Sequence, residues 1–293
     1  MILLTGANGQ LGQDFQKLFI ELNLDFIATD YKELDITDIG VVRSFVSAKK
    51  FTHIINCAAY NDVDKAESEK DKAYLLNQDA PNNLALVAKE IAAVFITYST
   101  DFVFDGTKGS PYTEEDTPNP ISVYAMSKYQ GEQAVLSSYK NSFVIRTSWV
   151  FGMGNNNFNK QLIDWSENRN SLNIVDDQRS SPTYSRDLAE YSWDLIKTNK
   201  FGLYHLSNSG ECSKYEQAKY VLDYIAWKGT LGTAKTADFN LPAKRSEYTK
   251  LDSGKLEAVI GKKIPTWQSG IERFLEEYRG EKRKPEKGDG RPE

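Results

Sequence analysis

Short apolar runs alternate with amphipathic stretches along the first half of the chain. Between the runs, apolar residues recur at helical spacing, as Phe15, Leu18 and Leu22 do. The runs themselves are too short for helices and are typical of buried strands. They lie at residues 1–4, 24–30, 53–59, 92–97 and 143–146. This alternation predicts right-handed βαβ units and therefore an α/β fold with a parallel sheet.

The helical patterns become longer and then less regular along the chain. Residues 71–92 form a long helical pattern, and Pro81 should kink or split it because proline lacks the N–H that a helix needs. The later elements that we expect are a loop at 152–157, helical stretches at 158–165 and 215–226, and a strand at 203–206. Residues 279–293 are charged and rich in Pro and Gly, which predicts a disordered tail.

Three glycines follow the first apolar run. Gly6, Gly9 and Gly12 give the spacing Gly-x-x-Gly-x-x-Gly, a variant of the dinucleotide fingerprint. Glycines permit a tight turn and a close backbone approach, and the helix that follows offers its amino-terminal N–H groups to a pyrophosphate. Asp30 closes the second run at nearly the distance expected for an acid that binds a ribose. These residues predict a Rossmann-like, doubly wound sheet that binds NAD or NADP.

A second chemical pattern lies between Thr100 and Lys128. Thr100 follows an apolar run, so we expect it at the carboxyl end of a strand, where open α/β sheets bind ligands. Tyr124 and Lys128 are one helical turn apart on one face. An ammonium beside a phenol favours the phenolate and should lower the pKa of the tyrosine. The three side chains together indicate a proton donor for a ketone or alcohol, although Tyr-x-x-x-Lys alone also fits a solvated surface helix.

Composition narrows the classes of function. The 293 residues allow one large α/β domain or a main domain with a smaller lobe, and 40% hydrophobic with 26% charged residues is usual for a globular protein. A net charge of −5 argues against nucleic-acid binding but allows an anionic substrate held by local positive groups. No apolar run approaches the length of a membrane span, and the start of the chain has no basic region. We therefore expect no nucleic-acid or membrane partner.

The few cysteines and histidines indicate neither a zinc site nor a disulfide framework. Cys57 lies within an apolar run, where a small apolar filler is expected, and Cys212 is the other cysteine. His53 begins the same run and is expected to be structural. This cysteine usage predicts a reducing, cytoplasmic location.

Further motifs give the chain a family resemblance. Beside the glycines and the Tyr/Lys pair, they are residues 58–60, 63–67, 98–104, 146–151 and 177–183. The combination resembles the extended short-chain dehydrogenase/reductase family, whose members use a Ser/Thr, Tyr and Lys triad with a nicotinamide cofactor. The similarity spans about residues 1–278.

The resemblance implies an NAD(P)H-dependent oxidoreductase of nucleotide-sugar biosynthesis. The implied reaction reduces the C4 keto group of dTDP-4-dehydro-L-rhamnose to dTDP-L-rhamnose. Tyr124 would donate the proton, Thr100 would bond the same oxygen, and Lys128 would serve both the phenol and the nicotinamide ribose. Residues 1–151 would mainly form the cofactor domain with the catalytic residues. Residues 152–278 would mainly form a smaller substrate-binding lobe, with the chain crossing back to the main domain.

The resemblance also assigns residues to the two ligands. Those expected at the cofactor are Gly6, Gly9, Gln10, Leu11, Gly12, Asp30, Asp35, Ile36, Ala58, Ala59, Tyr60, Tyr98, Tyr124 and Lys128. Those expected at the substrate are Asn61, Val63, Thr100, Asp101, Trp149 and Arg245. Asp35, placed near the adenine, and the neighbouring Asp38 fit a helix cap equally well.

Two residues, Trp149 and Arg245, are the main candidates for binding the sugar and the diphosphate. Trp149 follows a strand and can pack on the sugar, or it can be a core aromatic. Arg245 can clamp the diphosphate, or it can be an exposed loop charge. The family usually has Arg-Pro at this point, whereas this chain has Ala243 to Glu247.

Asp30 bears on the choice of cofactor. Its carboxylate should repel a 2′-phosphate, while Lys32 should partly offset that repulsion, so NADH is expected to be preferred over NADPH. Some relatives dimerise through magnesium, but no residue set here indicates that ion. A monomer and a homodimer both remain open.

Three alternatives share this scaffold. The 4,6-dehydratases need a carboxylate directly after Thr-Asp, and this chain has Phe102 there. The epimerases are harder to exclude, although their usual context differs from Thr-Asp-Phe-Val-Phe. A non-catalytic regulatory subunit resembling methionine adenosyltransferase beta is disfavoured by the intact Thr100, Tyr124 and Lys128.

Overall fold

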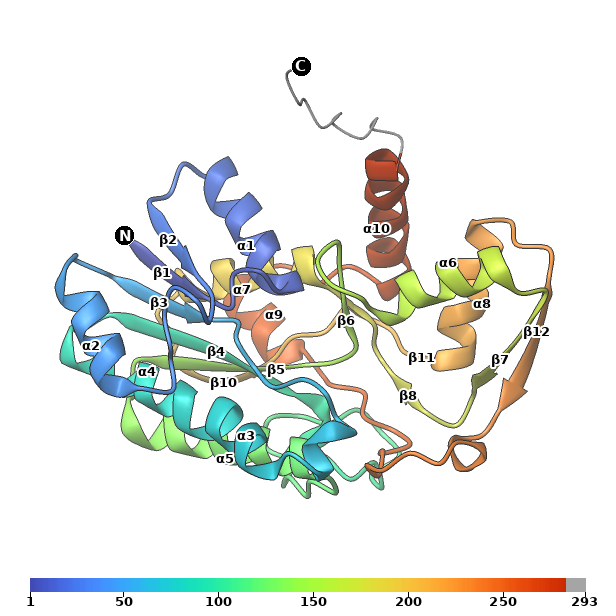
Figure 1. Ribbon diagram of the computed structural model, residues 1–293, viewed down its shortest axis with the longest axis horizontal. Coiled ribbons are helices and arrows are strands. Elements are labelled where there is room, and N and C mark those ends of the chain that lie inside the picture. Colours follow the sequence, from blue (N-terminus) through green and yellow to red (C-terminus); the bar gives the residue numbers. More distant parts are fainter. Residues whose placement is uncertain (283–293) are drawn as a thin grey trace, which may run out of the picture.

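A six-stranded parallel sheet forms the centre of the computed structural model, which describes residues 1–282 (Figure 1). The strands lie in the order β2-β1-β3-β4-β5-β10, which is the doubly wound 2-1-3-4-5 arrangement with one strand added. They are β1 (Ile2–Thr5), β2 (Phe26–Thr29), β3 (His53–Asn56), β4 (Val94–Thr100), β5 (Ser142–Thr147) and β10 (Gly202–His205). The predicted α/β fold is confirmed, and the switch in strand order between β1 and β3 is where such sheets bind ligands.

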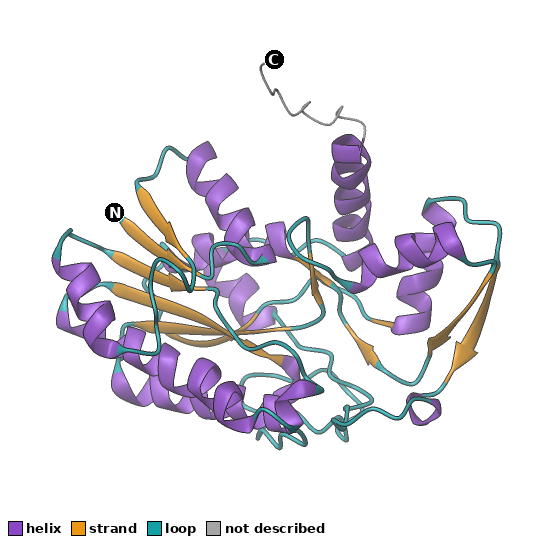
Figure 2. Cartoon of the chain, viewed as in Figure 1, coloured by secondary structure: helices purple, strands orange, loops and turns teal. Residues whose placement is uncertain are grey.

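Helices cover both faces of the sheet (Figure 2). One face carries α1 (Gln10–Glu21), α7 (Ser185–Ile196) and α9 (Gly254–Ile260), and the other carries α2 (Ile39–Ser47), α4 (Ala80–Glu90) and α5 (Val123–Ser138). Along β1, Leu4 packs on the first group and Leu3 on the second, because successive strand residues point to opposite faces. Burial on both faces explains why the strands are continuous apolar runs.

The predicted helix at 71–92 is continuous and contains a wider π-helical turn just before its proline. It consists of α3 (Lys70–Tyr74), the π-helical turn (Leu75–Asp79) and α4, in which Pro81 is the second residue. The residues at both junctions keep helical dihedral angles, so Pro81 lies inside one helix and the hydrogen-bond pattern changes in the turn directly before it. The π turn places Asn77 against α5, a contact that bears on the site below.

The fourth strand begins and ends later than its apolar run. Ala92 has a positive φ of 53° and ends the turn after α4, so β4 starts at Val94. The strand continues to Thr100, which pairs with Thr147 of β5. Thr100 therefore lies at the carboxyl end of the sheet, as the sequence predicts.

A smaller lobe lies beside the carboxyl end of the sheet (Figure 1). Its helices α6 (Phe158–Asn168), α8 (Lys214–Tyr224) and α10 (Trp267–Lys282) share an apolar cluster of their own. Its short strands pair as β7 (Ser171–Val175) with β12 (Thr230–Ala234), β8 (Arg179–Ser180) with β11 (Cys212–Ser213), and β6 (Val150–Phe151) with β9 (Thr183–Tyr184). Short helical turns lie at Lys65–Glu67, Asp101–Val103 and Thr236–Asp238.

The chain leaves this lobe and returns to the main domain. Strand β10 pairs with β5, and α7 packs against α1.

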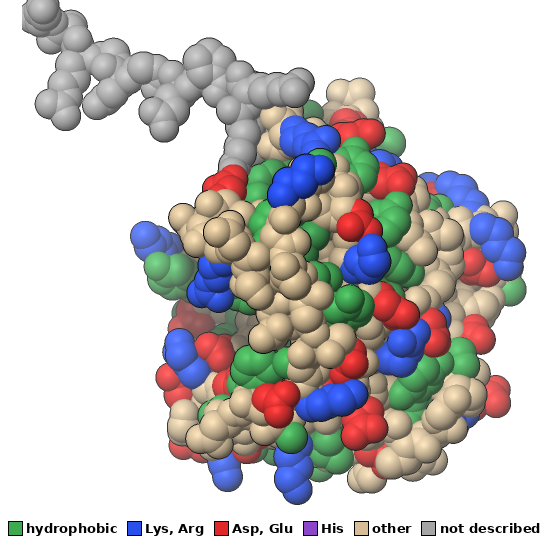
Figure 3. All heavy atoms as spheres, turned by 90° about the vertical axis from the view of Figure 1, so that its right-hand side faces the viewer, with side chains coloured by type: hydrophobic (Ala, Val, Ile, Leu, Met, Phe, Trp, Pro, Cys, Tyr) green, Lys and Arg blue, Asp and Glu red, His purple; other side chains and the backbone are tan. Residues whose placement is uncertain are grey.

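On the face of the molecule seen in Figure 3, acidic and basic side chains are interspersed. Of the predicted tail at 279–293, residues up to Lys282 belong to α10 and the others lie outside the described residues. Within residues 1–282, every helix is too short or too polar to cross a membrane.

Candidate active site

Two adjoining cavities open at the carboxyl end of the sheet. The first, of about 620 Å³, lies beside β1 and β2, and the second, of about 300 Å³, lies beside β4 and α5. Gly9, Cys57, Ala59, Asn61 and Asn155 line both, so the cavities are direct neighbours. Their sizes are those of small-molecule sites.

The glycine loop forms the junction between the cavities. Gly6 has a positive φ of 68°, and a Cβ there would lie 2.4 Å from the backbone N of Ala58. A Cβ on Gly12 would lie 2.3 Å from the Gly6 carbonyl oxygen, so Gly12 permits helix–loop packing and lines neither cavity. Gly9 is the N-cap of α1 and makes no side-chain cap, which leaves the helix amino terminus facing the cavities. This arrangement fits a dinucleotide pyrophosphate.

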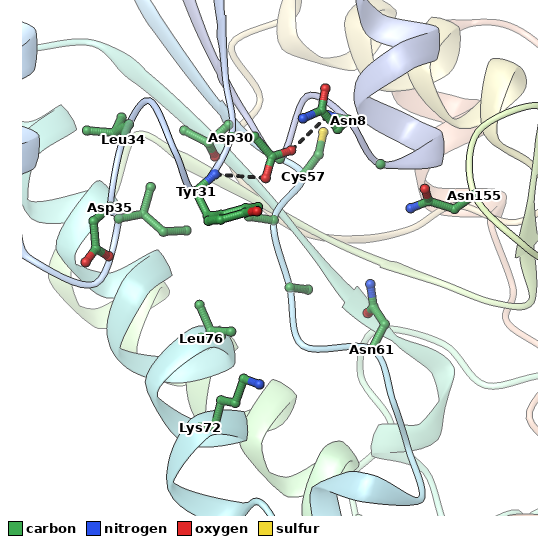
Figure 4. Close-up of a pocket in the computed structure, with 16 residues that line it drawn as sticks. Asn8, Asp30, Tyr31, Leu34, Asp35, Cys57, Asn61, Lys72, Leu76 and Asn155 are labelled. Atoms are coloured by element: carbon green, nitrogen blue, oxygen red, sulfur yellow. Dashed lines mark hydrogen bonds between the residues drawn. The ribbon is translucent and has the colours of Figure 1, made fainter.

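Asp30 lies at the wall of the first cavity (Figure 4). Its carboxylate accepts hydrogen bonds from the backbone N–H of Asn8, at 3.0 Å, and of Tyr31, at 2.8 Å. The carboxylate is therefore held in place beside the glycine loop, where a ribose-binding acid is expected. Asp35 and Ile36 line the same cavity, whereas Asp38 caps α2 by accepting from two backbone N–H groups.

Thr100, Tyr124 and Lys128 meet in the second cavity. Ser122 caps α5 by accepting from the backbone N–H of Ala125, so the helix begins just before Tyr124. Tyr124 and Lys128 are 8% and 6% exposed, which shows that neither belongs to a solvated helix face. The Lys128 Nζ donates to the carbonyl oxygen of Tyr98 at 2.6 Å.

The prediction that Lys128 lowers the pKa of Tyr124 is wrong. Burial raises the pKa of Tyr124 above its ordinary value, and the Thr100 hydroxyl offsets part of that rise. Burial also lowers the pKa of Lys128 to about 8, although Glu132 acts in the opposite direction. Desolvation opposes the charged form of each group and here outweighs their proximity. Tyr124 is accordingly a neutral phenol, the form that can donate a proton.

Asp101, which is expected at the substrate, also joins two parts of the molecule. Its carboxylate lines the second cavity and accepts hydrogen bonds from Thr100, Ser180 and Thr249. Burial raises its pKa to about 6, although these hydroxyl donors lower it. The contacts join the strand end that carries Thr100 to the lobe residues Ser180 and Thr249.

Trp149 and Arg245 occupy different environments. Trp149 lines the second cavity directly after β5, as expected, and has a positive φ of 45°. Arg245 lines neither cavity. Its guanidinium makes a two-point ion pair with Asp64, at 2.7 and 3.1 Å, and its side chain is 16% exposed. It is therefore neither a solvated loop charge nor an unpaired cation that faces the cavity.

The structure brings most of the predicted residues together. The first cavity is lined by Gly6, Gly9, Asp30, Asp35, Ile36, Ala58, Ala59 and Asn61. The second is lined by Gly9, Gln10, Leu11, Ala59, Asn61, Tyr98, Thr100, Asp101, Tyr124, Lys128 and Trp149. Gly12, Tyr60, Val63 and Arg245 line neither.

Asn77 and Lys214 have no signal in the local sequence pattern. The Asn77 side chain donates to Ser127 on α5 and to the carbonyl of Tyr60, and it accepts from the Tyr60 N–H. It thus anchors the helix that carries Tyr124 to the loop after β3. Lys214, on α8, lies over the Trp149 ring. Both contacts join segments far apart in sequence, so local spacing does not reveal them.

Known proteins share this sequence and architecture. Residues 1–280 match the family described as the RmlD substrate binding domain. A dTDP-4-dehydrorhamnose reductase of Aggregatibacter actinomycetemcomitans is 36% identical, covering 92% of this chain and 96% of the relative. A dTDP-4-keto-6-deoxy-D-glucose reductase of Streptomyces niveus is 36% identical, covering 74% of this chain and 76% of the relative. The crystal structure of dTDP-4-dehydrorhamnose reductase from Bacillus anthracis in complex with NADP has a TM-score of 0.91 at 38% identity, covering 94% of this chain and 98% of that one.

Proposed function

The chain belongs to the family of the RmlD substrate binding domain, and from this premise we propose that it is a dTDP-4-dehydrorhamnose reductase. The proposed reaction is the NAD(P)H-dependent reduction of the C4 keto group of dTDP-4-dehydro-L-rhamnose to dTDP-L-rhamnose. One observation carries the proposal: Thr100, Tyr124 and Lys128 meet in a cavity that adjoins the one beside the glycine loop and shares lining residues with it.

Tyr124 supplies the proton in this reaction. Its phenol is neutral because burial raises its pKa, so its O–H can point at the C4 oxygen and protonate it. Thr100 lies beside it at the end of β4, and its hydroxyl, which donates to Asp101 in the free protein, would turn to donate to the same oxygen. Its hydroxyl also accepts from the Phe102 N–H at 3.2 Å, which orients it. The two hydroxyls therefore hold the carbonyl in the position that reaction requires.

The glycine loop and Lys128 would hold the cofactor. The α1 amino terminus at Gly9 suits the pyrophosphate, and Asp30 suits the adenosine ribose. Lys128 lines the second cavity, where its ammonium suits the hydroxyls of the nicotinamide ribose. When bound, the reduced nicotinamide supplies a hydride to C4, while the protein supplies orientation and electrostatics.

NADH preference over NADPH is part of this proposal. Both oxygens of the Asp30 carboxylate face backbone N–H groups, and a 2′-phosphate beside them would meet a negative charge. The Lys32 Nζ lies 5.8 Å from the centre of the Tyr31 ring and can offset that charge in part. Measurable NADPH use is therefore expected as well. Side-by-side kinetics with the two cofactors test this, and a strong NADPH preference would contradict it.

Oxidation of NADH with dTDP-4-dehydro-L-rhamnose tests the main proposal. The wild-type protein should consume the two in equal amounts, whereas Tyr124→Phe should lower turnover about 100- to 10,000-fold and leave NADH affinity nearly unchanged. Lys128→Met should impair both turnover and cofactor affinity, because the ammonium serves both. Near-normal turnover by Tyr124→Phe would exclude the phenol as the proton donor.

The same assay separates the alternatives. The Streptomyces niveus relative supports a second substrate, the dTDP-linked 4-keto-6-deoxy-D-glucose, with the same chemistry at C4. Turnover with that ketosugar alone would favour it, and UDP- and GDP-linked ketosugars test the base. A regulatory subunit would oxidise no NADH with any of them. The cytoplasmic location remains a prediction.

A further inference from the structure

Lys214 places an ammonium next to Trp149, just outside the lining of the second cavity. It is the first residue of α8, in the lobe, and its Nζ lies 3.5 Å from the centre of the Trp149 ring. The Phe158 ring centre is 4.8 Å from the same Nζ. Two aromatic rings therefore hold the cation, and one of them lines the cavity that contains Thr100 and Tyr124.

Without a bound ligand, this position is unfavourable for a protonated lysine. The amino terminus of a helix carries partial positive charge, which repels a cation. Burial lowers the pKa of the Lys214 ammonium to about 7, although Cys212 and Asp101 act in the opposite direction. Among residues 1–280, whose side chains the structure describes, no carboxylate forms an ion pair with Nζ and no oxygen accepts a hydrogen bond from it. Its three N–H donors thus lack protein acceptors within that range.

Three other cations near the site already have partners. Arg245 is held by Asp64, and Arg179 lies between Glu211, at 3.6 Å, and Glu216, at 3.1 Å. Lys128 donates to the Tyr98 carbonyl. Lys214 therefore differs from these groups in having donors to offer an incoming ligand.

The backbone at Trp149 gives an independent sign of a functional position. A bulky residue with φ of 45° is a conformational outlier, and such strain of about 1–3 kcal/mol is concentrated at ligand sites. The strained turn directs the indole toward the cavity, where Lys214 contacts its ring. The pair combines an apolar surface for a sugar ring with an adjacent positive charge.

We propose that Lys214 binds the diphosphate of the nucleotide-sugar while Trp149 packs against the sugar. The inference rests on the proposed function, because it takes a nucleotide diphosphate as the anion. It also assigns to Lys214 the role that the sequence suggests for Arg245. A diphosphate offers the acceptors that the ammonium lacks, and its charge favours the protonated lysine.

Direct binding of dTDP to the full chain tests the inference apart from turnover. Isothermal titration calorimetry should show dTDP binding to Lys214→Met about tenfold to a hundredfold more weakly than to wild type. Lys214→Arg keeps the charge and should stay closer to wild type. Lys219→Met, on the exposed side of the same helix, is the matched control and should bind dTDP normally. NADH affinity should be unchanged in all three.

The outcomes separate this inference from the function on which it rests. If wild type and Lys214→Met bind dTDP equally, Lys214 does not contact the diphosphate, whereas the proposed reaction stands. If Lys214→Met binds dTDP normally but has a raised KM for the ketosugar nucleotide, the lysine acts on the sugar and the diphosphate assignment fails. If wild type binds neither dTDP, UDP nor GDP, the proposed function and the inference both fail. Lys214→Gln repeats the test should the methionine variant not fold.

Discussion

Arg146 and Glu132 form a buried ion pair close to Lys128. Arg146 is 1% exposed and forms a two-point ion pair with Glu132, at 2.7 and 2.9 Å, one helical turn beyond Lys128. Its guanidinium lies 5.1 Å from the Phe104 ring centre and 3.4 Å from Nε2 of His205. Glu132 also acts through space on the Lys128 ammonium, where it offsets part of the lowering of the pKa by burial.

His205 should make the protein sensitive to acid. Burial, assisted by Arg146, lowers the pKa of His205 to about 3 in the folded state. Below pH 6.5 the unfolded chain takes up a proton that the folded protein does not, so stability present above that pH is lost as the pH falls toward 3. The loss is about 1.4 kcal/mol per pH unit. Relative to wild type, His205→Asn should therefore gain stability as the pH falls from 6 to 4.

Urea unfolding at several pH values measures this effect. The asparagine can retain a donor toward the Tyr112 carbonyl, which lies 3.1 Å from the His205 Nδ1. His53 is present in both proteins, so its own titration cancels in the comparison. Unfolding free energies that run parallel with pH would show that His205 does not control the acid response.

At the scale of elements, the position of α5 depends on its contact with the π turn. The turn from Leu75 to Asp79 directs Asn77 at α5, and Gly131 provides the space for that approach. A Cβ on Gly131 would lie 2.0 Å from the Asn77 carbonyl oxygen. The glycine is thus required for close packing of the helix that carries Tyr124 and Lys128.

Gly131→Ala should displace α5 and lower turnover. Overpacking of this kind typically costs about 1–3 kcal/mol of unfolding free energy. Gly280→Ala is the matched control, because none of the described residues lies within 4 Å of the Cβ that it adds to a helix. That control should be neutral or about 0.5–1 kcal/mol more stable, since alanine favours helices over glycine. Denaturant melts with NADH oxidation assays test both variants, and equal effects would contradict the role of the Asn77 contact.

At the scale of the whole molecule, a few polar contacts join the lobe to the main domain. Asp101 receives hydrogen bonds from Ser180 and Thr249, and the Ser246 hydroxyl donates to the Phe104 carbonyl. Arg245 adds its ion pair with Asp64. These contacts hold the segment 243–249 against the chain after β4 and against the loop after β3, where Asn61 lines both cavities.

Arg245 should act by anchoring this segment. Arg245→Ala and Asp64→Asn should then raise the KM for the nucleotide-sugar by a similar factor, roughly tenfold for a loss of about 1.4 kcal/mol, and the double variant should add little. The KM for NADH should hardly change. If Arg245 instead clamped the diphosphate, Asp64→Asn would release it and would not reproduce the effect of Arg245→Ala. Steady-state kinetics on the three variants distinguish the two roles.

The fold class and the residues of the proposed reaction can be predicted from the sequence. Apolar runs at strand length, glycines at a three-residue spacing and a Tyr/Lys pair at one helical turn are local patterns, and local geometry converts them directly into structure. Thr100 could be placed at a strand end for the same reason. Asp30 beside the glycine loop follows from the βαβ unit that contains both.

Which charges are paired and which groups are buried depends on the tertiary structure. Arg245 meets Asp64 across 181 residues, and Thr249 meets Asp101 across 148, so neither pairing leaves a local pattern. Asn77 and Lys214 gain their roles from helices that pack against distant segments. The raised pKa of Tyr124 has the same origin, because desolvation depends on how the whole chain packs and not on the neighbouring lysine.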